Sequence, residues 1–306
     1  MSQTKHRTDW MSAGKFGMMV HWIAPGPAPE KGEWVSDLNE AVDRFDLDRF
    51  TAQFAATGAD WLIFTIGQNS GYYAGPNATL DELAGPGHCS RRHLVLELAQ
   101  RVSQLGKRFV GHLPAEVNGQ SEAIHRAFAW DPADQSEFQR RYCAFVRDYA
   151  VKFGALLHGW WFDGCYFSDE MYRHPQPPNF ASFAAAARAG NPDSIVAFNP
   201  GVLYPIISLT AEEDYTAGEI VEVDRVECAG RWVDGAQFHM LSYLGPSWAQ
   251  SPPRFSPEQV VAFTRGIVDK GGVVTWDVPI DAQGRIPPAF VDQLQALGKG
   301  LAQPTK

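Results

Sequence analysis

The chain has 306 residues, of which 45% are hydrophobic, and its formal net charge is −9. This acidic balance argues against a nucleic acid or an anionic membrane as a partner, because both require basic patches. No run of 18 apolar residues is present to span a membrane, and residues 1–9 lack the apolar stretch of a signal peptide. We therefore expect a cytoplasmic protein, or a secreted or periplasmic one whose signal peptide has been removed.

Apolar runs and segments of helical periodicity alternate along the chain, separated by Gly, Pro and polar turns. Strands are predicted at 16–22, 59–65, 107–113, 159–163, 194–199, 238–244 and 272–278. Helices are predicted at 47–56, 94–105, 131–153, 180–189, 257–269 and 288–301. Residues 25–33 read as a loop, and 214–223 is ambiguous between loop and strand. About eight strands alternating with helices predict one α/β domain over residues 1–306, a (β/α)8 TIM barrel.

An open doubly wound sheet is the alternative fold. It lacks support, because no glycine-rich phosphate loop follows any predicted strand. The four cysteines are widely spaced without a Cys-x-x-Cys pair, which predicts reduced thiols and no zinc site or disulfide framework. Ten tryptophans are many for this length; they fit a core, and they also fit carbohydrate stacking.

The clearest helix is the one predicted from residue 131. Asp131 is expected to cap its amino end, with Pro132 at the first helical position. Apolar side chains then recur every three or four residues and predict one buried face, made by Phe138, Tyr142, Phe145, Tyr149 and Phe153.

The strand at 159–163 ends in a carboxylate, Asp163, followed by Gly164 at a turn. In an α/β barrel the carboxyl ends of the strands carry the catalytic groups. Trp161 points to the same side as Asp163, because side chains repeat every second residue along a strand. An aromatic ring beside an acid suits a sugar, and the alternative reading is an Asp that only caps the next turn.

Several motifs, in the right order, resemble glycoside hydrolase family 29, the α-L-fucosidases. Lys15–Trp22 followed by Glu33 and Trp34 resembles the opening of that family, and residues 59–65 resemble its second strand. Trp161–Gly164 resembles the motif that carries the catalytic nucleophile. Residues 267–298 resemble the last strand and helix.

The resemblance implies a retaining glycosidase barrel, in which Asp163 is the nucleophile and His21, Trp34 and Trp161 line the sugar site. The chain departs from the family in four ways. Gln68 and Asn69 stand where the family has a His-His pair, and Pro200-Gly201 stands where it has an Arg. The family's acid/base Glu often lies about ten residues before a Ser-Trp segment, but Phe238 and His239 stand at that distance from Ser247. The fourth departure is that the family's C-terminal β-sandwich is missing. We therefore expect a divergent member whose sugar specificity differs from fucose.

A retaining glycosidase needs a second carboxyl group roughly 5 Å from the nucleophile. Glu219 is the first candidate, because Asp214–Glu219 resembles a family segment late in the barrel. Glu116, just past the third strand, is the second, and Glu222 and Asp277 are further possibilities.

Polar side chains at strand ends complete the predicted sugar site. His112 and His239 are expected there, together with the amides of Gln68 and Asn69, which can bind hydroxyls as donor and as acceptor. The alternative for each histidine is a satisfied core residue. A metal site is disfavoured, since barrel metallohydrolases usually place His-x-His on one strand and none exists here.

The sequence thus predicts a carbohydrate-acting hydrolase with no cofactor and no metal. Two rivals remain: a sugar-binding barrel that has lost its acid/base, and a metal-assisted barrel hydrolase. No oligomeric state follows from the sequence.

Overall fold

The computed structural model describes residues 6–22, 26–28, 33–35, 37–166 and 171–303. Its centre is a curled sheet of seven parallel strands. The strands are β1 (Phe16–Val20), β4 (Trp61–Thr65), β5 (Arg108–Pro114), β6 (Gly159–Asp163), β7 (Ile195–Phe198), β10 (His239–Tyr243) and β11 (Val273–Asp277). They pair in the order β10-β11-β1-β4-β5-β6-β7. From β1 to β7 each strand lies beside the next strand of this sheet along the chain, and the last two strands, β11 and β10, continue the sheet on the other side of β1.

The two edge strands, β7 and β10, are linked by an irregular segment, residues 214–220. The Asp214 amide donates to the Val196 carbonyl oxygen in β7 (3.0 Å), and the Ile220 amide donates to Leu241 in β10 (2.9 Å). Gly218 in this segment has a φ of +63°, and a Cβ there would lie 1.9 Å from the His239 carbonyl oxygen. This left-handed residue breaks the pleat, so the segment takes the place of an eighth strand without being one. The α/β class and the curled parallel sheet are therefore confirmed, whereas a closed barrel of eight strands is not found among the described residues.

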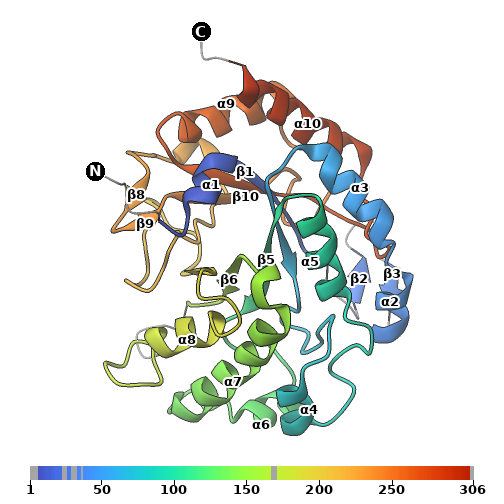
Figure 1. Ribbon diagram of the computed structural model, residues 1–306, viewed down its shortest axis with the longest axis vertical. Helices are drawn as coiled ribbons and strands as arrows, with labels where there is room; N and C mark the ends of the chain where they lie inside the picture. The colour runs from blue at the N-terminus through green and yellow to red at the C-terminus, as the bar shows by residue number, and fades with distance from the viewer. Residues whose placement is uncertain (1–5, 23–25, 29–32, 36, 167–170, 304–306) are drawn as a thin grey trace.

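Helices surround the strands in Figure 1, where α3, α5, α7, α8, α9 and α10 lie around the sheet. Their bounds are α1 (Asp9–Gly14), α2 (Leu38–Arg44), α3 (Leu47–Thr57), α4 (Ala78–Ala84), α5 (Leu94–Gln104), α6 (Glu122–Phe128), α7 (Ser136–Phe153), α8 (Phe180–Ala187), α9 (Pro257–Val268) and α10 (Pro288–Ala302). All six predicted helices are present. Short 3-10 turns occupy Gly154–Leu156 and Val223–Arg225. No described helix has both the length and the apolar character needed to traverse a lipid bilayer.

Helix α7 has the predicted apolar face but not the predicted start. Its five aromatic residues are all buried. The helix begins at Ser136, after Gln135, because both aspartates upstream bind the backbone locally. The Asp131 carboxylate accepts from the Ala133 amide and Asp134 accepts from Ser136, each at 2.9 Å. These local turns compete with the helix for the same backbone groups.

Two short antiparallel hairpins lie outside the main sheet. One joins β2 (Gly26–Ala28) to β3 (Glu33–Val35), where a loop was predicted, and part of that loop is outside the described residues. The other joins β8 (Trp232–Val233) to β9 (Ala236–Gln237).

The inside of the curled sheet is a separate apolar cluster. Side chains two residues apart in each strand point inward, and the cluster comprises Met11, Met19, Trp61, Ile63, Val110, Trp161, Ile195, Ala197, Tyr215, Ala217, Leu241 and Val273. Tyr215 and Ala217 come from the irregular segment, which thus fills the gap between β7 and β10. Continuing the same inward row toward the carboxyl ends of the strands leads to polar residues.

Candidate active site

Asp163 is the last residue of β6, the fourth strand of the sheet along the chain. It continues the inward row of Gly159 and Trp161, so its carboxylate stands over the apolar inner cluster. Gly164 follows with a φ of +81°, a conformation that favours glycine. This turn aims the Gly164 amide at the Asp163 carboxylate, to which it donates at 2.9 Å.

Side-chain donors also converge on the Asp163 carboxylate. Asn199 donates at 2.8 Å and Tyr166 at 3.0 Å to Oδ1, and Gln68 donates at 3.2 Å to Oδ2. Burial alone would raise the pKa of Asp163, but the hydrogen bonds from Asn199, Tyr166 and Gln68 favour the charged form, and the net shift of that pKa is downward. Asp163 is therefore held as an anion, the form that a nucleophile requires.

A second carboxyl group lies next to Asp163. The Asn199 side-chain nitrogen that donates to Asp163 also donates to Glu219 Oε2, at 2.5 Å. The two carboxylate oxygens therefore lie no farther apart than the sum of these two distances. Retaining glycosidases place their two carboxyl groups about 5–5.5 Å apart and inverting ones about 6.5–9.5 Å apart, so this close approach fits a retaining pair better than an inverting one.

The two carboxyl groups are driven toward opposite protonation states. Burial raises the pKa of Glu219, and the nearby Asp163 charge raises it further, while the Asn199 hydrogen bond and His21 act the other way. The net shift of the Glu219 pKa is upward, whereas that of Asp163 is downward. Paired carboxyl groups whose environments separate their pKa values are typical of an acid and a nucleophile.

His21 follows the end of β1 and is held by Asp277 at the end of β11. Its Nδ1 lies 2.7 Å from Asp277 Oδ1, and Asp277 Oδ2 accepts from the Ala249 amide at 2.8 Å. Burial would lower the pKa of His21, but Asp277, Asp163 and Glu219 together raise it. The ring also contacts Trp248, with centroids 5.6 Å apart. His21 is thus a fixed donor beside both carboxyl groups.

Buried polar atoms without partners also belong to this end of the sheet. His112 in β5 is fully buried, yet no described residue is a hydrogen-bond partner of either ring nitrogen or of Gln68 Oε1. Burial lowers the pKa of His112 to about 3, so the ring is neutral at physiological pH. Leaving a buried polar atom unpaired costs roughly 1–3 kcal/mol. Such atoms suit a ligand rich in hydroxyl groups.

The fold is shared with known glycoside hydrolases. An endo-fucoidan hydrolase of glycoside hydrolase family 107, P5AFcnA, superimposes with a TM-score of 0.74 and 17% sequence identity, covering 98% of this chain and 94% of its own. A second family 107 endo-fucoidan hydrolase, MfFcnA4, gives 0.71 and 17% identity, and this chain spans about half of its length, 53%. The α-L-fucosidase AlfC from Lactobacillus casei, in complex with α-L-fucose, superimposes with a TM-score of 0.64 and 16% sequence identity, covering 96% of this chain and 97% of its own. The sequence itself matches no protein-family model and no curated protein.

The chain has the fold of these fucose-acting glycoside hydrolases. At 16–17% identity the likeness concerns the fold alone, and it reaches both family 107 and an α-L-fucosidase. The predicted resemblance to family 29 is therefore supported only at the level of a fucose-related glycoside hydrolase fold.

Other predicted residues lie in different surroundings. Glu116 is buried near Gly164, where a Cβ would lie 3.4 Å from its Oε1, and burial raises its pKa. Its Oε2 accepts from the Asn118 amide, so Glu116 stabilises its own loop. Asn69 is exposed, and no hydrogen bond joins it to Asp163 within the described part of the chain. Glu222 is exposed and pairs with Arg225.

Of the two tryptophans predicted for the sugar site, only Trp161 has a described side chain, and it presents no free ring. Trp161 is 3% exposed, stacks on His112 with centroids 5.2 Å apart, and donates to the Ala217 carbonyl oxygen at 3.0 Å. The Trp161 ring thus packs against His112 from the neighbouring strand. Trp34 belongs to β3, but its side chain lies outside the described part of the structure.

His239 is a core residue at the far end of the sheet, since it opens β10. Its Nδ1 donates to the Thr216 carbonyl oxygen (2.9 Å), and its Nε2 lies 2.8 Å from the Thr275 hydroxyl. The prediction that His239 lies in the sugar site is therefore not met, because His239 is at the amino end of its strand and Asp163 is at the carboxyl end of a parallel strand.

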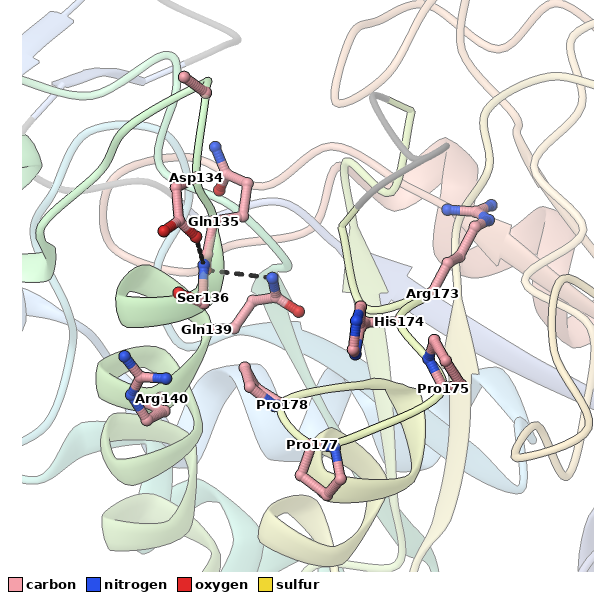
Figure 2. A pocket seen from close by; sticks show the side chains of 11 residues that line it. Asp134, Gln135, Ser136, Gln139, Arg140, Arg173, His174, Pro175, Pro177 and Pro178 are labelled. Atoms are coloured by element: carbon pink, nitrogen blue, oxygen red, sulfur yellow. Dashed lines mark hydrogen bonds between the residues drawn. The ribbon is translucent and has the colours of Figure 1, made fainter.

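A large cavity near the carboxyl ends of the strands is not this site. It measures about 600 Å³ and lies between the start of α7 and the loop before α8. Figure 2 shows Gln139 and His174 on opposite sides of it, while the Arg173 guanidinium extends away from the helix. It contains no pair of carboxyl groups, so nothing in it matches the Asp163 arrangement.

Three site residues escaped the sequence prediction: Asn199, Tyr166 and Trp248. Asn199 was recognised only as the end of a strand, and its inward position follows once β7 is seen to pair with β6. Among the described residues no group of three or more His, Cys, Asp or Glu is arranged to hold a metal ion.

Proposed function

We propose that the protein is a retaining, fucosidase-like glycoside hydrolase with Asp163 as nucleophile and Glu219 as acid/base. The observation that carries this proposal is the shared Asn199 amide, which holds one oxygen of each carboxyl group. The opposite pKa shifts of Asp163 and Glu219 support the same assignment. Glu116 is the second candidate for the acid/base, because its pKa is also raised and Asp163 contributes to that shift.

The reaction would proceed in two displacements. Asp163 attacks the anomeric carbon while Glu219 gives its proton to the departing glycosidic oxygen, and a covalent glycosyl-enzyme forms. Glu219, now a carboxylate, takes a proton from water as that water attacks the same carbon and releases Asp163. The second step restores both groups to their starting states.

The surrounding polar groups would bind the sugar ring. Neutral His112 offers one donor and one acceptor, Gln68 Oε1 accepts, and His21 donates. Family 29 has a His-His pair where Gln68 and Asn69 stand. Asn69 is exposed here, so we propose that the preferred glycone differs from fucose.

A panel of nitrophenyl glycosides that includes α-L-fucoside tests both parts. Two or three missing hydrogen bonds, at about 0.5–1.5 kcal/mol each, would weaken fucose by roughly one to three decades in kcat/KM. Turnover of another glycoside, with fucoside weaker, supports the proposal. If α-L-fucoside is turned over with a higher kcat/KM than every other glycoside, the proposed specificity is wrong. If no glycoside of the panel is turned over, the proposed hydrolase activity is wrong.

A non-catalytic sugar-binding barrel is the remaining rival. It predicts only His, Gln and Asn around Asp163, and the nearby Glu219 favours the enzyme instead.

A further inference from the structure

A second polar pocket lies at the amino ends of the strands, opposite Asp163. It measures about 350 Å³. Arg108 at the start of β5, His158 just before β6, and Asn191 and Asp193 before β7 line it, together with Trp10 of α1. The residues come from three neighbouring strand entrances and the helix beneath them.

Three charged side chains line this pocket, and they do not neutralise one another. Arg7 pairs with Asp214 at 3.3 Å. Arg108 and Asp193 are both exposed, and neither side chain has a hydrogen bond or ion pair within the described ranges. His158 Nδ1 accepts from the Phe109 amide at 3.3 Å, so the neutral ring carries its hydrogen on Nε2. Burial lowers the pKa of His158 to about 4, which keeps the ring neutral. The pocket therefore offers donors and an acceptor together.

The pocket walls are fixed before any ligand binds. The Trp10 ring packs edge-on against Trp61 and His158, with centroids 6.0 and 6.3 Å away. Asn191 donates to the Leu157 carbonyl oxygen at 2.9 Å and accepts from the Asp193 amide at 3.1 Å. A preformed site loses less conformational freedom on binding.

We propose that this pocket is a non-catalytic saccharide-binding site. An indole beside free donors and a free carboxylate fits a sugar, whose ring has apolar faces and whose hydroxyls both donate and accept. Asp193 disfavours a simple anion, because Arg7 is already paired with Asp214, and Arg108 disfavours a cation. His6, also in the lining, packs against Trp232, which is 44% exposed, so the aromatic surface continues beyond the pocket.

This inference rests on the proposed function, since a second contact would hold a polymeric substrate near the catalytic end. Binding at two linked points raises the effective concentration of chain ends or internal bonds. The site itself, however, requires no turnover for its detection.

The test is affinity gel electrophoresis of the full chain in parallel gels that contain desulfated fucoidan, xylan or galactan, because the preferred sugar is proposed to differ from fucose. Arg108→Ala and Asp193→Ala change exposed side chains, and Arg126→Ala on α6 is the matched control. Each pocket variant should bind about three- to tenfold more weakly, as expected for one or two lost hydrogen bonds. The control should bind like the parent, and turnover of a small nitrophenyl glycoside should be unchanged in all three.

Equal retardation of parent and pocket variants, or no retardation of the parent, overturns the inference. Binding of native sulfated fucoidan only, abolished by inorganic sulfate, also overturns it, since the pocket would then be an anion site. The two proposals fail separately: weaker binding by the pocket variants without any glycoside turnover removes the enzyme but not the second site.

Discussion

His112 and His239 are both fully buried inside the curled sheet, at opposite ends of it. His239 has partners for both nitrogens, and burial lowers its pKa to about 4. His112 is also fully buried and neutral, but neither nitrogen has a partner in the part of the chain that the structure describes. Burial and residue type are the same, so the difference lies in the partners that the surrounding protein supplies. His239 is satisfied by Thr216 and Thr275, whereas His112 leaves both ring nitrogens for a ligand.

The largest effect expected from this contrast is at Asp163. Asp163→Ala removes the proposed nucleophile from the carboxyl end of the sheet. Turnover should fall by several decades, because one difficult displacement is no longer divided into two easier ones. Single-turnover rate and melting temperature should be measured together, with Glu222→Ala as an exposed control. Azide should restore part of the rate by filling the vacated space. If turnover persists while the melting temperature drops, Asp163 is only a structural cap.

Glu219→Gln should give the next largest effect. The loss of a general acid costs about 10²–10⁴-fold in rate. The pKa of Asp163 is lowered, so the acidic limb of the pH–kcat/KM profile should lie below the ordinary Asp range. The pKa of Glu219 is raised, so the alkaline limb should lie above the ordinary Glu range and should disappear in the variant.

Glu116→Gln is the matched control for that profile. Glu116 is also a buried acid with a raised pKa, but it binds its own loop. An unchanged alkaline limb is expected. If Glu116→Gln abolishes the limb and Glu219→Gln does not, the acid/base assignment is reversed.

The smallest effects come from the two histidines themselves, given the same substitution. His112→Leu replaces unpaired polar atoms by an apolar side chain of similar size, so stability should hold or rise slightly. Turnover should fall about tenfold or more, because sugar contacts are lost. His239→Leu leaves the buried Thr216 carbonyl oxygen without its hydrogen bond and should lower the free energy of unfolding by about 1–3 kcal/mol. Turnover per folded molecule should stay normal. Denaturant unfolding and kcat/KM separate the two, and identical responses would refute the contrast.

Much of the sheet was predictable because its signals are local. Buried parallel strands are short apolar runs, and Asp163 is marked by such a run and by Gly164. The start of α7 was missed because Asp131 and Asp134 bind nearby amides in turns, an alternative that a capping pattern does not reveal. Trp161 was placed on the correct side of its strand, but the pattern could not show that His112 covers its ring.

The partners within the site were harder to predict, because they depend on pairing between distant segments. Asn199 reaches Asp163 and Glu219 only when β7 lies beside β6 and residues 214–220 lie beside β7. Glu219 was chosen from a family likeness. Its proximity to Asp163 is a property of the folded sheet.

The irregular segment 214–220 has a consequence for how such a site can evolve. On a regular strand, moving a carboxylate by one residue turns it from the inside of the sheet to the outside. Glu219 stands after Gly218, where the pleat is already broken. A one-residue insertion or deletion here would not be forced to reverse every following side chain. The proposed proton donor therefore lies where the sheet best tolerates a change of length, while the proposed nucleophile lies on a regular strand. Homologues that keep Asp163 in register could accordingly carry their acid at different positions along this segment.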